Sequence, residues 1–182
     1  MSKSDFTRFV TRQQVVRQEN EAFNREKRIK EWKEYLDVLY TSIREFMQPY
    51  LEDKTAEMKF ADLELNEELL GIYAVQKLSL TIGGSNVTFR PIGTILIGGR
   101  GRVDVEGPRG TARLVLVNKK VTQGRQLINV SISLNGEPTP PPKTNEEKIE
   151  LVWKIMSPPP EITFTDLSRD TFFDLILLIA ND

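Results

Sequence analysis

Asp104 and Glu106 are two carboxylates whose spacing could support acid–base or metal chemistry in this 182-residue chain. Two residues apart on a strand, they point to the same face. Paired carboxylates can bind magnesium or share a proton during catalysis. A nuclease site of the Asp…Glu-x-Lys type also needs a Glu-x-Lys on a following strand, and no predicted strand after Asp104 contains one. Ion pairs with Arg100 and Arg102 on that face are therefore the predicted role of these carboxylates.

The chain contains no histidine and no cysteine. Histidine is the usual general base near neutral pH and the commonest metal ligand, and cysteine supplies thiolates. These two absences exclude Ser-His-Asp triads, Cys-His dyads, thiolate zinc sites, iron–sulfur clusters and disulfides. Any catalysis would have to use carboxylates, lysine, tyrosine or bound magnesium. The sequence favours a protein that is not an enzyme, with no cofactor and no catalytic or metal-binding residue assigned.

The glycine-rich stretch 97–102, Ile-Gly-Gly-Arg-Gly-Arg, superficially resembles a phosphate-binding loop. It lacks the Gly-Lys-Ser/Thr of such loops. It also leads into a predicted strand, whereas a phosphate is normally held at the N-terminus of a helix. We interpret the glycines as hairpin residues.

Basic residues gather in the section 90–125, where only two acids oppose them. Arginines on hairpin turns could bind an anion or a nucleic-acid backbone. A nucleic-acid site should also offer aromatic rings for stacking, and Phe89 is the only aromatic residue in the range 80–136, so nucleic acid is the weaker alternative. The candidate residues for binding an anion or a partner are Arg100, Arg102, Arg109, Arg113, Lys119 and Lys120.

These turns belong to a chain that alternates between apolar and polar residues, as strands with one buried face do. Short glycine turns with no helical connector predict antiparallel neighbours. In the first strand the even positions from Ile72 to Ile82 are expected to be buried, and Pro91 predicts a bulge or an edge position. Strands are predicted at 72–82, 87–97, 102–106, 111–117, 127–134, 148–156 and 161–164.

A long helix is predicted over 4–50. Its second half carries an apolar seam at heptad spacing: Ile29, Trp32, Leu36, Leu39, Ile43, Phe46 and Tyr50. The seam fits a helix that covers the sheet, and a coiled-coil dimer is the alternative. The polar first half, 1–28, is predicted to be a helical arm. The candidate interface residues are Phe9, Val16, Phe23 and Trp32.

Three further segments complete the chain. The acidic segment 51–70 is interpreted as a loop with a short helix and a solvated acidic face, and 136–147 as an exposed proline-rich loop. A last helix is predicted over 166–180 with Thr165 as its N-cap. Asp166, Asp170 and Asp174 recur every four residues, and the helix dipole explains acids in its first turn better than a metal stripe does.

Together these elements predict an α+β fold: a twisted antiparallel β-meander of six or seven strands, packed by the amphipathic N-terminal helix and the C-terminal helix. Residues 29–182 are expected to form one domain. No signal peptide or membrane span is expected, and a cytoplasmic location is predicted. The leading functional hypothesis is a non-enzymatic protein-interaction or assembly module. Its opposite charge patches would also permit self-association. The alternatives are an anion or nucleic-acid binder, and a carboxylate- or metal-dependent enzyme.

Overall fold

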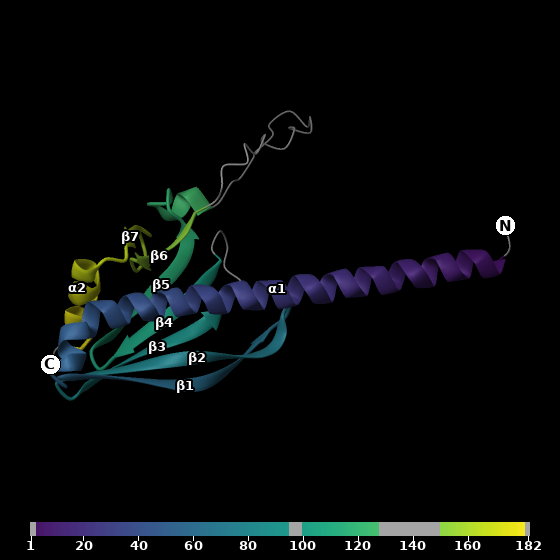
Figure 1. The fold of residues 1–182 in the computed structure, drawn as a ribbon. Coiled ribbons are helices and arrows are strands. Elements are labelled where there is room, and N and C mark those ends of the chain that lie inside the picture. Colours follow the sequence, from purple (N-terminus) through teal and green to yellow (C-terminus); the bar gives the residue numbers. More distant parts are fainter. Residues whose placement is uncertain (1–2, 95–99, 128–149, 181–182) are drawn as a thin grey trace, which may run out of the picture.

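The computed structural model describes residues 3–94, 100–127 and 150–180; the side chains of 3–10 and 127 are outside the description. The chain forms an α+β fold in which a seven-stranded antiparallel sheet lies between two terminal helices in the sequence (Figure 1). The elements are α1 (Lys3–Glu52), β1 (Ala56–Glu67), β2 (Gly71–Ile82), β3 (Ser85–Gly93), β4 (Gly101–Gly107), β5 (Gly110–Asn118), η1 (Gly124–Leu127), β6 (Leu151–Met156), β7 (Phe164–Asp166) and α2 (Arg169–Ala180).

The strands are arranged in the sheet in the same order as in the sequence, and every neighbouring pair is antiparallel. The predicted meander is confirmed. Short turns join the first strands, so each strand can pair only with the one just before it. The pairing of β3 with β4 shifts register between Pro91 and Gly93, where the proline predicted a bulge.

Both helices pack on the same face of the sheet and share one core with it. The seam of α1 forms part of that core: Trp32, Leu36, Leu39 and Ile43 are all buried. The structure therefore agrees with the first interpretation of the seam, a helix that covers the sheet of its own chain. Two hydrogen bonds fix α1 there, from Tyr40 Oη to the Gln76 carbonyl (2.6 Å) and from Trp153 Nε1 to the Tyr35 carbonyl (2.9 Å).

Helix α2 docks beside the C-terminal end of α1 through Phe172, whose ring lies 5.5 Å from that of Phe46 and 6.3 Å from that of Phe89. Ser168 caps α2: its Oγ accepts a hydrogen bond from the Thr171 N–H, while its own N–H donates to Thr171 Oγ1. The prediction that Thr165 is the N-cap of this helix was wrong. Thr165 lies in β7, opposite Ile155.

The acidic segment after α1 was predicted wrongly. It forms strand β1, which pairs with β2 along its whole length. Except for Glu67, its charged side chains are exposed, and charges on an edge strand discourage pairing with other chains.

The buried face of β2 also differs from the prediction in its first half. Leu78 and Leu80 are fully buried as expected, but Ile72 is 65% exposed while Tyr73 and Val75 are buried. The buried positions change from odd-numbered to even-numbered between Val75 and Leu78, although the pairing with β1 continues there without a break. Strict alternation from Ile72 to Ile82 therefore assigned the wrong face to the first residues.

The strand predicted at 127–134 and the proline-rich loop at 136–147 lie outside the described residues, apart from Leu127, which ends η1. Within the described ranges, no helix combines the length and apolar character needed to cross a lipid bilayer.

Candidate functional site

The first half of α1 extends well beyond the sheet (Figure 1). We call residues 3–28 the arm. Every side chain from 11 to 28 is exposed, including Val16 (44%) and Phe23 (67%), two of the predicted interface residues. Phe9 lies seven residues before Val16 in the same helix, and its side chain is outside the described residues. Since seven residues are nearly two helical turns, the three positions share one face of the arm.

Trp32, the fourth predicted interface residue, lies in the protein's own core. Its side chain is 2% exposed, and its ring centroid is 5.9 Å from that of Trp153. A partner could not reach Trp32 unless α1 left the sheet. The structure therefore removes Trp32 from the candidate interface.

The arm carries charge pairs along its own surface. Arg17 Nε lies 2.8 Å from Glu21 Oε1, and this hydrogen bond and charge raise the pKa of Arg17. Lys27 and Glu31 are 3.9 Å apart at the junction with the domain. Pairs at i,i+4 of this kind support a solvated helix that has no tertiary packing.

The six predicted basic residues do not form one patch. Arg100 precedes β4 and Lys119 and Lys120 follow β5, which places these three at one end of the sheet. Arg109 lies in the turn between β4 and β5 at the opposite end, about 20 Å away along the strands. The backbone N–H of Arg109 donates to the Ile179 carbonyl, so that turn is tied to α2.

Arg102 and Arg113 lie in the sheet on either side of the predicted carboxylate Asp104. Arg102 binds Asp104 through two hydrogen bonds, Nε to Oδ1 (2.6 Å) and Nη2 to Oδ2 (2.7 Å), and Arg113 is opposite Asp104 in the register. The Arg102–Asp104 pair is one of the ion pairs that the sequence predicted. Both oxygens of Asp104 are occupied, which leaves this carboxylate poorly placed to bind a metal or act as a base.

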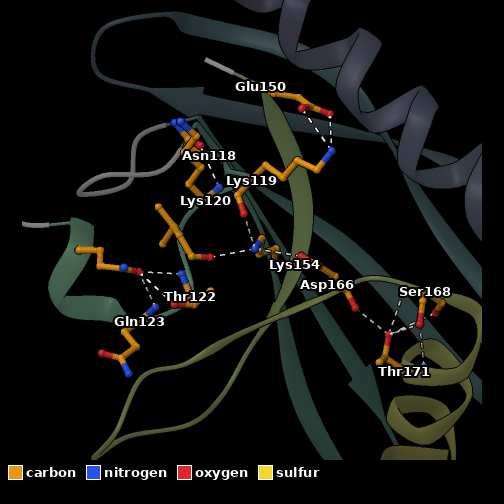
Figure 2. A network of polar contacts seen from close by, with 12 residues as sticks. Asn118, Lys119, Lys120, Thr122, Gln123, Glu150, Lys154, Asp166, Ser168 and Thr171 are labelled. Carbon is orange, nitrogen blue, oxygen red and sulfur yellow. Dashed lines mark hydrogen bonds and ion pairs between the residues drawn. The ribbon is translucent and has the colours of Figure 1, made fainter. Parts of the chain in front are cut away.

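Lys119 and Lys120, at the same end of the sheet as Arg100, border the network shown in Figure 2. Lys119 Nζ pairs with Glu150 at 3.1 Å, and the Lys120 N–H donates to Asn118 Oδ1. At the centre lies Lys154, whose side chain is only 3% exposed. Its Nζ donates to the carbonyls of Lys119 and Val121 (2.8 Å each) and lies 2.9 Å from Asp166 Oδ1. All three protons are used, so Lys154 joins the loop after β5 to β7.

A hollow of about 650 Å³ lies under the base of the arm. Its lining includes Arg28, Trp32, Thr94 and Arg100, from α1, the end of β3 and the start of β4. The indole Nε1 of Trp32 is buried and has no hydrogen-bond partner. Among the described residues that line it, Lys27, Arg28 and Arg100 are basic and Glu31 is the single acid, so this part of the lining is mainly cationic.

A buried carboxylate that the sequence did not single out lies near this hollow. Glu67 accepts hydrogen bonds from the Thr94 N–H (3.0 Å), from Thr94 Oγ1 (2.9 Å) and from the Tyr73 hydroxyl. Burial, followed by the bond to Glu67, raises the pKa of Tyr73. Gly93 makes room for the carboxylate, because a Cβ there would lie 2.8 Å from Glu67 Cδ. The hydrogen bonds of Glu67 to Tyr73 and Thr94 join the β1–β2 hairpin to the end of β3.

Glu67 and Lys154 could not have been found from the sequence, because one lies among solvated acids and the other in an ordinary strand. Within the described part of the chain, no three His, Cys, Asp or Glu residues come together as a metal site would require. Asp166 pairs with Lys154 and does not form a metal stripe with Asp170 and Asp174.

Comparison with protein-family models, with curated proteins and with solved structures found no match to this chain.

Proposed function

We propose that this protein is a non-enzymatic interaction module that docks on a protein partner through the arm. One observation carries the proposal. The same helix that is locked into the core by Trp32 and Ile43 continues as an exposed segment, 11–28, with Val15, Val16 and Phe23 in solvent.

The anchoring of α1 makes the arm suited to binding. A helix in isolation is marginally stable, but the arm continues a helix whose second half is already fixed to the sheet. The bonds of Tyr40 and Trp153 to backbone carbonyls hold that half in place. A preorganised helix loses less conformational entropy on binding than a flexible peptide does.

The partner's chemistry follows from the exposed residues. Val16 and Phe23 form a narrow apolar stripe, and charged side chains of both signs flank it. A helix of this kind binds an apolar groove or another helix through residues spaced by whole turns. The partner should therefore present an apolar strip with mixed charges along its edges. We keep the predicted cytoplasmic location as part of the proposal, to be tested by cell fractionation.

A photo-crosslinking amino acid at position 16 or 23 tests this function in cells that carry the chain. The matched control is position 38 of the same helix, because Val38 is 57% exposed but lies over the sheet domain. Crosslinks to protein from 16 and 23, absent from 38, are expected. If the arm positions give no more protein crosslinks than position 38, the arm is not a docking element.

The cationic hollow favours a second candidate, the binding of a small anion. Arg28, Arg100 and Lys27 line it. Within the described residues, only Lys27 of these three cations forms an ion pair, with Glu31 at 3.9 Å. Titration calorimetry with inorganic phosphate tests this candidate. Phosphate binding should weaken in Arg28→Ala and Arg100→Ala, but not in Arg113→Ala on the outer face of the sheet. Equal binding by all three variants would reject it.

A further inference from the structure

We propose that the partner of the arm is a second copy of this chain, bound antiparallel with Val16 of both copies at a two-fold axis. This inference rests on the proposed docking function of the arm and names its partner. It replaces the general self-association expected from opposite charge patches with a defined helix pair.

The apolar stripe of the arm is symmetric about its middle residue. Phe9 and Phe23 each lie seven residues from Val16. An ideal helix drifts by only about 20° per seven residues, so all three stay on one face. Reversing the direction of the helix superimposes this stripe on itself. In an antiparallel pair, Phe23 of one copy then lies opposite Phe9 of the other, and Val16 packs on Val16.

The charges beside the stripe match in the same arrangement. Arg12 and Glu19 are seven residues apart and flank the stripe on the same side. In an antiparallel pair centred on Val16, each flank of the stripe faces the same flank of the other copy. Arg12 lies four residues before Val16, and Glu19 lies three residues after it. Arg12 of each copy therefore meets Glu19 of the other, which gives two identical ion pairs.

These two charges are available for such pairs. Both side chains are exposed, and neither Arg12 nor Glu19 forms an ion pair within the described part of the chain. By contrast, Arg17 and Glu21 already pair with each other. A parallel pair would place opposite flanks together, so that Arg12 would lie beside the amide Gln13 and Glu19 beside the amide Asn20. Charge complementarity thus selects the antiparallel orientation.

The length of the arm also fits this pairing. The first residue of α1 that packs against the core is Ile29, thirteen residues after Val16. Helix residues 4–28 of the two copies can overlap for about 37 Å before either arm reaches Ile29 of the other copy. Because the overlap is reciprocal, the association closes as a dimer and does not extend into a filament.

Sedimentation equilibrium of the full chain from about 1 to 100 µM tests the dimer. We expect a monomer–dimer equilibrium that Val16→Asp abolishes. Val15→Asp is the matched control, because Val15 is similarly exposed (47%) but lies about 100° around the helix from Val16. A chain that is monomeric throughout, or a dimer that survives Val16→Asp, overturns the inference. Crosslinks from position 16 to a different protein would then still support the docking function.

A charge exchange tests the register. Arg12→Glu and Glu19→Arg should each weaken the dimer about tenfold, and the double variant should recover most of the loss. The matched exchange of Arg17 and Glu21, which pair within one helix, should leave the dimer unchanged. Failure of the Arg12/Glu19 double variant to recover overturns the predicted pairing.

The absence of native cysteine allows a direct test of orientation. Gln13→Cys and Asn20→Cys place thiols on one flank of the stripe, at positions that face each other across the two-fold axis. Under mild oxidation, a mixture of the two variants should form the mixed disulfide. If disulfides between identical variants form as readily as the mixed disulfide, the antiparallel pairing is overturned.

Discussion

The six-membered ring of Trp32 lies against the backbone of Gly101. A Cβ at position 101 would come within 2.8 Å of the ring atoms Cε3 and Cη2. This contact joins α1 to the first residue of β4 and explains a glycine in a strand, where glycine normally weakens pairing.

We expect Gly101→Ala to lower the free energy of unfolding by roughly 1–3 kcal/mol, because the added methyl must displace a fully packed ring. Urea denaturation measures the change. Gly110→Ala is the matched control, since its nearest neighbour would be Ile179 Cγ2 at 3.9 Å, an ordinary contact. Replacing Trp32 by Leu in the Gly101→Ala background should recover part of the loss. Equal stability of the two alanine variants would show that the Trp32 ring adjusts freely.

Glu67→Leu should destabilise the protein by roughly 1–3 kcal/mol, since three buried donors from Tyr73 and Thr94 lose their acceptor. Glu67→Gln keeps one acceptor oxygen and should cost less. Urea denaturation of both variants gives the comparison, and Glu64→Leu, an exposed position on β1, is the control. A Glu67→Leu variant as stable as the control would contradict the assigned role.

Replacing Lys154 should have a much larger effect than replacing its carboxylate partner. Lys154→Met leaves the carbonyls of Lys119 and Val121 without a donor and should cost roughly 1–3 kcal/mol. Asp166→Asn should cost about 1 kcal/mol or less, because the Asp166 side chain is 77% exposed and its charge is screened by water. Thermal denaturation at low and high salt can separate the contribution of the ion pair from that of the carbonyl contacts. Equal losses would mean that the ion pair matters more than the carbonyl contacts.

Stability should fall at alkaline pH. Burial raises the pKa of both Tyr40 and Tyr73 in the folded protein. An unfolded tyrosine loses its proton near about pH 10, so above this pH the unfolded chain binds fewer protons than the folded one. The contribution of these groups is fully present below that pH and declines as the pH rises further. Tyr73→Phe should reduce the decline between about pH 9 and 11 in urea titrations. The partly exposed Tyr50→Phe is the control, and matching slopes in all three proteins would refute the effect.

Substitutions in the arm should leave the fold intact. Val16→Asp and Phe23→Asp change exposed side chains, so their free energies of unfolding should stay within about 0.5 kcal/mol of the original at low protein concentration. The same denaturation assay on Ile43→Asp, in the buried half of the helix, should show a severe loss. A destabilised Val16→Asp monomer would indicate that the arm packs on its own domain.

Much of the architecture follows from local patterns in the sequence. The seam from Ile29 to Phe46 has a period that only a helix with one buried side produces, and the glycine turns fix antiparallel neighbours. The ion pair of Arg102 with Asp104 was predicted because both lie on one face of a single strand. Such features depend on residues close together in the chain.

The errors have a common physical origin in residues whose surroundings come from distant segments. Strand β1 was missed because an edge strand tolerates Glu57, Lys59 and Glu64 on its solvated side, which resembles a loop. Trp32 was assigned to an interface because its partners, Gly101 and Trp153, are far away in the sequence. Glu67 was dismissed as a solvated acid because Thr94 lies 27 residues further on.

The order of elements along the chain has a consequence for synthesis. Helix α1 is made first, but the indole that bonds to the Tyr35 carbonyl belongs to Trp153, 118 residues later. At about 5–20 residues per second, the ribosome needs roughly 6–24 s to cover that interval. Throughout this time the apolar side of α1 lacks part of its final cover, although the first strands can already pair with one another. Completion of the fold is therefore a late event on the ribosome, and the nascent chain is most vulnerable to aggregation just before β6 emerges.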